Sequence, residues 1–389
     1  MGKPIAEELA KKQKEISVSE FFERNKHILG FDSAVRAIIT SVKEGVDNAL
    51  DACEEAGILP EVNVEIARAH PVPVGRSGGA TQPEELVLTV EDNGPGIVKK
   101  QIGNIFARLL YGSRFHAIRQ SRGQQGIGIS AVVMYGQLTT GRPAVIESKI
   151  GPEQPTLRMH LKLDTKRNQP DVVKEEVVHW DKPHGTKVSV HLVGKYQRGG
   201  QSVYEYLRST AIVNPHARIT FKEPDGTTTI FERASEALPA PTQEIKPHPE
   251  GVELGTLLKM AKHTQTTKVV SFLVDEFTRV GYRTARDICE FAEKELSPDE
   301  RLALKGKALE DWKPENLDVP HAKALLAAFK KVKIQSPPTD CLSPIGELLV
   351  KKGVRKELPD TDFVATMTRP ANVYSGNPFQ VEAGIAYGG

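Results

Sequence analysis

The segment SVKEGVDNALDA at residues 41–52 constrains the fold of this chain more than any other stretch. If the segment is helical, side chains three and four positions apart lie on one face, so Glu44, Asn48 and Asp51 form a polar stripe. Asp47 lies beside them. The opposite face is apolar at the same period, with Val35, Ile38, Ile39, Val42, Val46, Ala49, Leu50 and Cys53. This pattern predicts a helix packed on a core along one side and open to water along the other.

The polar stripe allows two interpretations. Three carboxylates and an amide are typical of a solvated surface, but they can also form the wall of a site that holds a cation. In such a site a carboxylate can orient water, and an amide oxygen suits Mg²⁺. The helix alone leaves both interpretations open.

Chain length and composition limit the class of protein. A chain of 389 residues is longer than one core of roughly 250 to 300 residues supports, which predicts two or three domains. The 52 Lys and Arg nearly balance the 50 Asp and Glu, so charge neither demands nor excludes nucleic acid. The three cysteines, Cys53, Cys289 and Cys341, form no CxxC pair and indicate reduced thiols. No apolar run approaches the ~20 residues of a membrane span, so we expect a cytoplasmic protein without membrane contact.

An apolar arm precedes the central helix. The stretch SVSEFFERNKHILGF at residues 17–31 carries too many large apolar side chains for a free tail. We therefore expect residues 1–32 to dock, either on their own domain or on a neighbouring protomer. The sequence does not choose between these.

Two glycine-containing segments follow. Strand patterns at residues 62–69 and 86–92 lead into DNGPGI, where glycines can take the positive φ of a turn. A helix-like stretch at residues 99–120 then leads to RGQQGIGIS, just before a predicted buried helix. Glycines at a helix N-terminus favour phosphate, because free N–H groups and the helix dipole point there. The segment is neither a Walker loop nor a dinucleotide fingerprint.

The remaining patterns predict the domain order. Strands at residues 144–150, 156–164, 172–180 and 186–194, the last opened by HGT, make an α+β layer with the helices, and residues 70–85 read as an exposed loop. A proline-rich linker at residues 238–251 precedes a helical region, which is a spacer or a nucleic-acid contact. An α/β region that ends on a strand after fewer than ~60 residues is expected to be incomplete. The expected domains are residues 1–32, 33–240, 241–330 and 331–389.

At this point the chain resembles a known superfamily. EGVDNALDA, DNGPGI, RGQQGIGIS and HGT, in this order, are similar to the motifs of the GHKL ATPases. Further stretches resemble the B-subunit family of archaeal DNA topoisomerase VI: SEFFERNKHILGF, YGSRFHAIRQSRGQQGIG, EIKPHPEG, PPTDCLSPIGE and NPFQVEAGIAYGG. The resemblance covers essentially the whole chain except residues 70–85, which look like an insertion.

The resemblance implies a site that binds ATP and Mg²⁺. Glu44 would activate the attacking water, Asn48 would bind Mg²⁺, and Asp92 would read the adenine amine. Thr186 of HGT would support the γ-phosphate side. The other residues implied to bind the nucleotide are Gly96, Ser113, Arg114, Gly123, Gln124, Gln125, Gly126, Ile127, Gly128, Ile129 and Ser130. Some relatives have Lys where Ser130 stands.

The resemblance also implies the fold and the partners. The expected order is a GHKL α/β sandwich, a helix-two-turns-helix domain and the start of a transducer domain. A lysine of the family's transducer that reaches the γ-phosphate would lie beyond Gly389. ATP would dimerise two B subunits, with the arm around Phe21 exchanged between them. This gate would pass one DNA duplex through a break made by an A subunit that carries the cleaving tyrosine, and so relax or decatenate DNA.

Two other interpretations remain. The chain could be a GHKL ATPase of the mismatch-repair or chaperone type, which shares the site but needs no A subunit. It could also be a truncated nucleotide-binding fragment with little turnover. A histidine kinase is disfavoured, because no histidine lies in a long dimerisation helix before the ATPase motifs.

Overall fold

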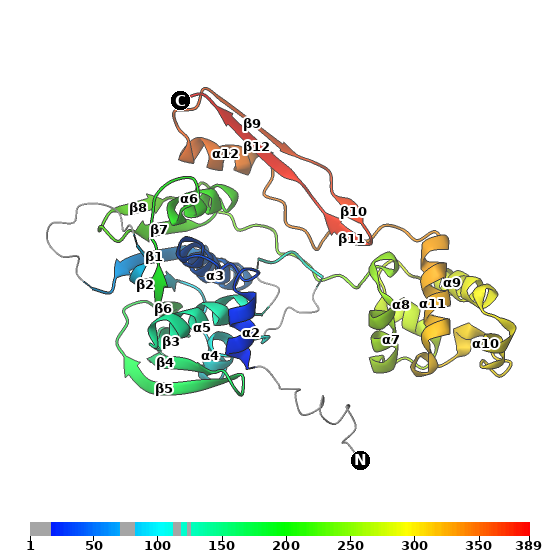
Figure 1. The fold of residues 1–389 in the computed structure, drawn as a ribbon. Helices are drawn as coiled ribbons and strands as arrows, with labels where there is room; N and C mark the ends of the chain where they lie inside the picture. The colour runs from blue at the N-terminus through cyan, green and yellow to red at the C-terminus, as the bar shows by residue number, and fades with distance from the viewer. Residues whose placement is uncertain (1–16, 71–81, 112–117, 123–125) are drawn as a thin grey trace, which may run out of the picture.

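The structure is a computed structural model that describes residues 17–70, 82–111, 118–122 and 126–389. Three parts follow one another along the chain (Figure 1): a sheet covered by helices, a group of helices, and a small α/β unit. Each part has its own cluster of buried apolar side chains. Within the described ranges no helix is long and apolar enough to cross a membrane.

The first part is built on an eight-stranded sheet in the order β5-β4-β3-β6-β2-β1-β7-β8. Neighbouring strands are antiparallel except β1 and β7, which are parallel. Strands β1 to β6 lie at the segments predicted to be strands, although β5 is mostly exposed along its length. The bounds of the eight strands are β1 Glu61–Arg68, β2 Glu84–Asp92, β3 Ala144–Lys149, β4 Thr156–Asp164, β5 Gln169–Val178, β6 Gly185–Gly194, β7 Arg218–Lys222 and β8 Thr228–Phe231.

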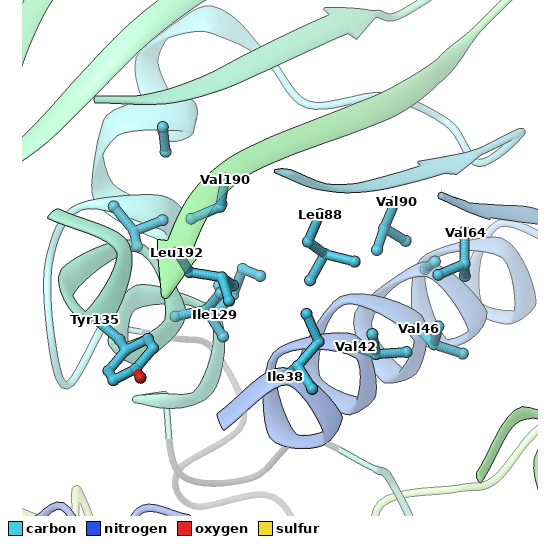
Figure 2. Close-up of a cluster of buried hydrophobic side chains, with 14 of the residues drawn as sticks. Ile38, Val42, Val46, Val64, Leu88, Val90, Ile129, Tyr135, Val190 and Leu192 are labelled. Carbon is cyan, nitrogen blue, oxygen red and sulfur yellow. The ribbon is translucent and has the colours of Figure 1, made fainter. Parts of the chain in front are cut away.

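Helices pack on this sheet to form an α/β sandwich. They are α2 Val18–Asn25, α3 Ala34–Glu55, α4 Lys99–Phe106, α5 Gly128–Thr140 and α6 Val203–Val213. Figure 2 shows the apolar side of α3, with Ile38, Val42 and Val46, next to side chains of the strands such as Leu88 and Val90. The predicted apolar stripe therefore faces the core. Ser33 caps α3 by accepting the Arg36 N–H, which ties down one of the unpaired donors at its start.

The stretch at residues 99–120 was expected to be helix-like throughout, and this prediction is wrong. Helix α4 ends at Phe106, and Leu110 has a left-handed backbone with φ of 58°. The Leu109 N–H donates to Asn168 Oδ1, and Asn168 Nδ2 donates to the Leu109 carbonyl. A side chain from a distant turn thus replaces the helical partners of Leu109. Residues 112–117 lie outside the described ranges.

The described part of the arm folds onto its own domain. Phe22 and Phe31 are buried in the core of the sheet part, with ring centroids 5.5 Å apart, and Phe31 stacks 4.8 Å from Tyr135. Phe21 instead is 44% exposed. Residues 1–16 lie outside the described part of the chain.

The second part is helical, as predicted. Its helices are α7 Leu254–His263, α8 Val269–Glu276, α9 Tyr282–Glu295, α10 Pro298–Leu302 and α11 Val319–Lys331, with short 3-10 turns at Pro249–Gly251, Leu309–Asp311 and Pro314–Asn316. The short α10 was missed by the sequence analysis, although Ser297 and Glu300 form a capping box at its start. Phe272, Phe277 and Phe329 lie in the centre of this part.

The third part contains α12 Glu347–Glu357, β9 Phe363–Thr368, β10 Asn372–Tyr374, β11 Asn377–Phe379 and β12 Glu382–Tyr387. Strands β9 and β12 pair antiparallel, and so do β10 and β11. Its small core of Val350, Val354 and Val364 packs against Ile212 of α6. The α/β character expected of this region is therefore present.

Candidate nucleotide site

The residues on the polar face of α3 differ in their exposure to solvent. Asn48 is exposed and the Glu44 carboxylate is partly buried, whereas Asp51 is buried. The sequence pattern placed all three on one solvated stripe, and Asp51 departs from it because Arg122 covers it. Glu44 and Asn48, one turn apart, remain as the open part of this face.

Glu44 lies against the start of α5. A Cβ added to Gly128, the first residue of α5, would lie only 1.8 Å from Glu44 Oε2. Gly126, two residues earlier, has a positive φ of 60°. The backbone of Gly126 thus suits a glycine, and a side chain at position 128 would displace the Glu44 carboxylate from its place beside α5. The arrangement places a carboxylate beside the N-terminus of α5, where the first N–H groups have no partner within the helix.

The charge of Glu44 is tuned by its surroundings. Burial raises the pKa of Glu44, and so does the nearby Asp47 carboxylate, while the Lys43 ammonium opposes both. Lys43 Nζ lies 3.7 Å from Glu44 Oε1 and 3.6 Å from Asp47 Oδ2. The Tyr206 hydroxyl of α6 donates to Asp47 Oδ1 at 3.2 Å. A carboxylate with a raised pKa at a helix N-terminus is suited to accept a proton from water.

Asp92 ends β2 and faces Thr186 directly in the β2/β6 register. Its Oδ1 accepts the N–H groups of Gly94 at 2.8 Å and Thr186 at 3.1 Å. No residue that the structure describes donates to Oδ2. Burial raises the pKa of Asp92 to about 6, although the two backbone hydrogen bonds oppose this shift. Asp92 is thus a buried carboxyl with one oxygen occupied by the backbone and the other available to a donor such as an amine.

The turn after Asp92 is held by close backbone contacts. Gly96 has φ of 73°, and a Cβ there would lie 2.2 Å from the Lys149 carbonyl oxygen. A Cβ on Gly185 would lie 2.3 Å from the Asp92 carbonyl oxygen. His184 Nδ1 lies 2.8 Å from the Gly94 carbonyl oxygen and bonds it. DNGPGI and HGT, about ninety residues apart in the chain, therefore form one surface next to Asp92.

At residues 129 and 130, the end of the glycine segment, the side chains point into the core. Ile129 and Ser130 are buried, and the Ser130 hydroxyl donates to the Ile127 carbonyl oxygen at 3.0 Å. Only the main chain of these residues can therefore face a ligand. Other residues predicted for the site, Ser113, Arg114, Gly123, Gln124 and Gln125, lie outside the described ranges.

Sequence reasoning missed a charged network under the site. Arg122 donates to Asp51 and Glu54 of α3 at 2.8 Å each, and to Asn214 at the end of α6 at 2.5 Å. His216 Nε2 lies 2.7 Å from Glu54 Oε1. Burial alone would raise the pKa of Glu54, but the bonds from His216 and Arg122 outweigh it and lower the pKa to about 2. The only signal was the spacing of Asp51 and Glu54 on one helix face.

The site fits a nucleotide-bound magnesium ion better than an independent metal centre. Among the described residues, no group of three or more His, Cys, Asp or Glu side chains could hold a metal ion. Mg²⁺ bound with a nucleotide usually takes one or two protein oxygens and completes its shell with phosphates and water. The exposed Asn48 amide, one turn from Glu44, meets that requirement.

Two family models match the chain. Residues 34–232 match the model described as "Histidine kinase-, DNA gyrase B-, and HSP90-like ATPase". Residues 337–389 match the model described as "Topoisomerase VI B subunit, transducer". The two matches cover the sheet part and the third part of the fold.

Curated relatives match over the whole chain. The B subunit of type 2 DNA topoisomerase 6 from Methanococcoides burtonii is 54% identical over 390 residues, which is 100% of this chain and 58% of the relative. The protein of the same name from Natronomonas pharaonis is 36% identical over 561 residues, with 100% of this chain and 68% of the relative covered. The chain thus spans 58% of the length of the first of these relatives.

Among solved structures, the 43K ATPase domain of Thermus thermophilus gyrase B in complex with an aminocoumarin is 17% identical. It matches with a TM-score of 0.36 over 64% of this chain and 56% of that one. A likeness at this score adds no argument.

Proposed function

The chain belongs to the family of type 2 DNA topoisomerase 6 B subunits, with a GHKL ATPase domain and transducer residues, and on that premise we propose that it binds and hydrolyses ATP as the gate of a type IIB topoisomerase. The observation that carries the proposal is the placement of Glu44 against Gly128 at the start of α5, with Asn48 one turn away.

Each residue has a role in the proposed hydrolysis. Glu44 accepts a proton from the attacking water, and its partial burial keeps its pKa above the ordinary value. The N-terminus of α5 receives the phosphates through backbone N–H groups, as free helix ends do. Asp92 Oδ2 accepts the adenine amine. The Thr186 N–H donates to Asp92 Oδ1, so Thr186 lies at the adenine end of the proposed site, and its role on the γ-phosphate side stays a prediction.

Magnesium belongs to the proposal as well. Asn48 supplies an amide oxygen, and a bound Mg²⁺ would neutralise charge on the phosphates. The roles of Ser113, Arg114 and residues 123–125 in wrapping the phosphates stay predictions.

The partners follow from the family. We propose that ATP joins two copies of this chain around a DNA duplex, and that an A subunit with the cleaving tyrosine makes the break. A decatenation assay tests this: activity that appears only when the A subunit is added supports the proposal, and activity of the chain alone contradicts it. The cytoplasmic location and the helix-two-turns-helix assignment of the helical part stay predictions.

The molar mass of the purified chain tests the gate directly. Light scattering with Mg²⁺ and a non-hydrolysable ATP analogue should show a shift from monomer to dimer. Asn48→Ala should abolish the shift, because it removes the proposed magnesium ligand, while Asn316→Ala on the exposed surface of the helical part should leave it unchanged.

Two other outcomes would count against the gate. Bound analogue without a mass shift would mean that this chain binds nucleotide but does not close as a gate. No binding of the analogue at all would remove the proposed ATP site.

A further inference from the structure

Among the described residues, several contacts join the sheet part and the segment that follows it to the transducer residues 337–389, including the Ser343 hydroxyl on the Ala240 carbonyl oxygen at 2.9 Å and the Gln243 N–H on the Asp340 carbonyl oxygen at 2.9 Å. Two further contacts involve α6 and residues 118–122. In the first, α12 packs on α6 so closely that a Cβ on Gly353 would lie 2.5 Å from the Ile212 carbonyl oxygen. The second runs through residues 118–122, here called the junction segment. A cleft of about 940 Å³ lies beside the junction segment, and its lining comes from α3, the end of α6, residues 237–242 and residues 343–349. Beside the junction segment, the ATPase domain and the transducer residues are therefore separated by open space.

The junction segment is held on one side by the helix that carries Glu44 and Asn48. Arg119 Nη2 lies 2.8 Å from Glu55 Oε1, and Arg122 bonds both Asp51 and Glu54. These partners occupy the last two turns of α3. A displacement of this end of α3 is therefore passed to the junction segment through paired charges rather than through a single contact.

On its other side, the junction segment is held by the first residues of the transducer. The Gln120 N–H donates to the Cys341 carbonyl at 2.8 Å. The Ser343 N–H donates to Gln120 Oε1 at 2.9 Å, and Gln120 Nε2 donates to the Ser343 carbonyl at 3.4 Å. The side-chain amide of Gln120 thus pairs with the backbone of Ser343 as a neighbouring strand would.

Residues after Ser343 pass this contact into the transducer. The Glu382 carboxylate of β12 accepts the N–H groups of Ile345 at 2.7 Å and Gly346 at 2.6 Å. Gly346 directly precedes α12. Glu382 also accepts the Thr368 hydroxyl of β9 at 2.8 Å. A shift at Ser343 is therefore carried to the start of α12 and to both strands of its sheet.

We propose that Gln120 is a positioning residue that couples the nucleotide state of α3 to the transducer, through Ser343. The proposal rests on the proposed function, since it assumes that α3 responds to a bound nucleotide. It adds a link that lies outside the nucleotide site and contacts neither the phosphates nor the adenine-reading Asp92. Because Gln120 is exposed, its replacement by alanine removes the two side-chain bonds to Ser343, keeps the backbone bond to Cys341 and opens no core cavity.

Hydrogen–deuterium exchange of the amides at residues 341–357 tests the link. It is measured with and without Mg²⁺ and a non-hydrolysable ATP analogue, and analogue binding is measured separately by calorimetry. In the wild-type chain the analogue should change the exchange of these amides. In Gln120→Ala the analogue should still bind, but its effect on the exchange rate should fall about fivefold, the lower end of typical coupling between sites.

Two variants separate coupling from a merely structural role. Gln120→Glu keeps an acceptor for the Ser343 N–H but loses the 3.4 Å donor bond and sets a carboxylate oxygen opposite the Ser343 carbonyl oxygen, so its response should lie between those of the wild type and Gln120→Ala. Gln154→Ala changes an exposed glutamine of a distant turn and should respond as the wild type does.

The outcomes distinguish this inference from the proposed function. A wild-type chain that binds no analogue overturns both. If the wild-type chain binds the analogue, the inference alone is overturned by any of three results: no change at residues 341–357, an unchanged response in Gln120→Ala, or an equal loss in Gln154→Ala.

Discussion

Glu44 shows how one residue can combine burial with access to solvent. Gly128 lets its carboxylate approach the start of α5, while Lys43 and Asp47 keep the site polar. A larger residue at position 128 would displace the carboxylate, because its Cβ would overlap Glu44 Oε2. The position of the Glu44 carboxylate therefore depends on a glycine that is distant in sequence.

We expect Glu44→Ala to keep analogue binding and to lower ATP turnover by about a hundredfold or more, the usual effect of losing a general base. Since burial raises the pKa of Glu44, the wild-type rate should fall on the acid side at a higher pH than an exposed glutamate would give. Phosphate release and calorimetry measure the two effects. Unchanged turnover would remove Glu44 from this role, and Glu153→Ala on an exposed turn serves as the control.

Asp92 is a buried carboxyl whose ionisation lowers the stability of the folded chain. Its pKa is about 6 in the folded chain against an ordinary value of 3.8, so the folded state binds more protons between these values. Stability therefore falls as pH rises from about 4 to about 6, and above this range the charge stays buried at a cost of about 3 kcal/mol.

Asp92→Asn should raise the free energy of unfolding by about 2 kcal/mol near pH 8 and make little difference near pH 4, because it removes the buried charge. Oδ1 of the new amide can still accept the Gly94 and Thr186 N–H groups. Urea unfolding at both pH values measures this, and nucleotide binding should weaken at the same time. A variant that is less stable near pH 8 would contradict the account.

At the scale of elements, α2 is anchored by one aromatic residue and presents another. Phe22 is fully buried against Phe31, whereas Phe21 is 44% exposed on the same helix. Substitutions at these two positions therefore test two properties separately. Phe22 reports on the stability of the domain, and Phe21 reports on any contact that the arm makes outside the domain.

We expect Phe22→Ala to lower the free energy of unfolding by about 3 to 5 kcal/mol, as large-to-small core changes do. Phe21→Ala should change stability by less than about 1 kcal/mol but weaken the nucleotide-dependent dimer, if the arm reaches a second copy. Urea unfolding and light scattering measure the two. An equal loss of stability in both variants would show that Phe21 belongs to the core.

The stability that the contact between α3 and the junction segment contributes depends on pH, through Glu54. The pKa of Glu54 is lowered from 4.5 to about 2, so its contribution to stability is complete above pH 4.5 and is lost as pH falls towards 2. The contribution is about 3 kcal/mol at most, because a pKa unit corresponds to about 1.4 kcal/mol.

Glu54→Gln should therefore lower the free energy of unfolding by up to about 3 kcal/mol near neutral pH, with the difference shrinking below about pH 4. Urea unfolding across this range measures the effect. Glu153→Gln, which alters an exposed carboxylate, should leave the curve unchanged. A difference between wild type and Glu54→Gln that persists undiminished at about pH 2 would contradict the proposed ion pairs.

At the scale of the whole molecule, the three buried clusters are separate. Among the described residues, the core of the sheet part and the core of the helical part share no residue, and Ile212 of α6 is the one residue of the sheet part that packs against the small transducer core. Ligand binding stabilises the unit that contains the site, so the parts should respond differently to nucleotide.

A non-hydrolysable ATP analogue at about a hundred times its Kd should stabilise the ATPase domain by about 2.7 kcal/mol and leave the unfolding of the helical part unchanged. Differential scanning calorimetry resolves the two transitions. A single transition that shifts as a whole would mean that the parts unfold together. The Asn48→Ala variant, with weakened binding, should show a smaller shift of the first transition.

The elements could largely be predicted because they depend on local patterns. The apolar stripe of Val42 and Val46 repeats at the period of a helix, and the alternation in β2 repeats at the period of a strand. The glycines before α5 mark a turn by their residue type alone. The end of α4 could not be predicted, because Asn168 competes for the backbone of Leu109 from about sixty residues away. Local helix propensity does not depend on a hydrogen-bond partner that is so distant in sequence.

The sequence by itself determined which residues are candidates for the proposed chemistry: a helix with Glu44 and Asn48, a turn at Asp92, and glycines ahead of a buried helix. Only the tertiary structure decided how they meet. The β2/β6 register places Thr186 on Asp92, Gly128 admits Glu44, and Arg122 and Gln120 tie α3 to the transducer. The physical reason is that periodicity is a property of neighbours in the chain, whereas hydrogen bonds and ion pairs between distant segments depend on the packing of the whole fold.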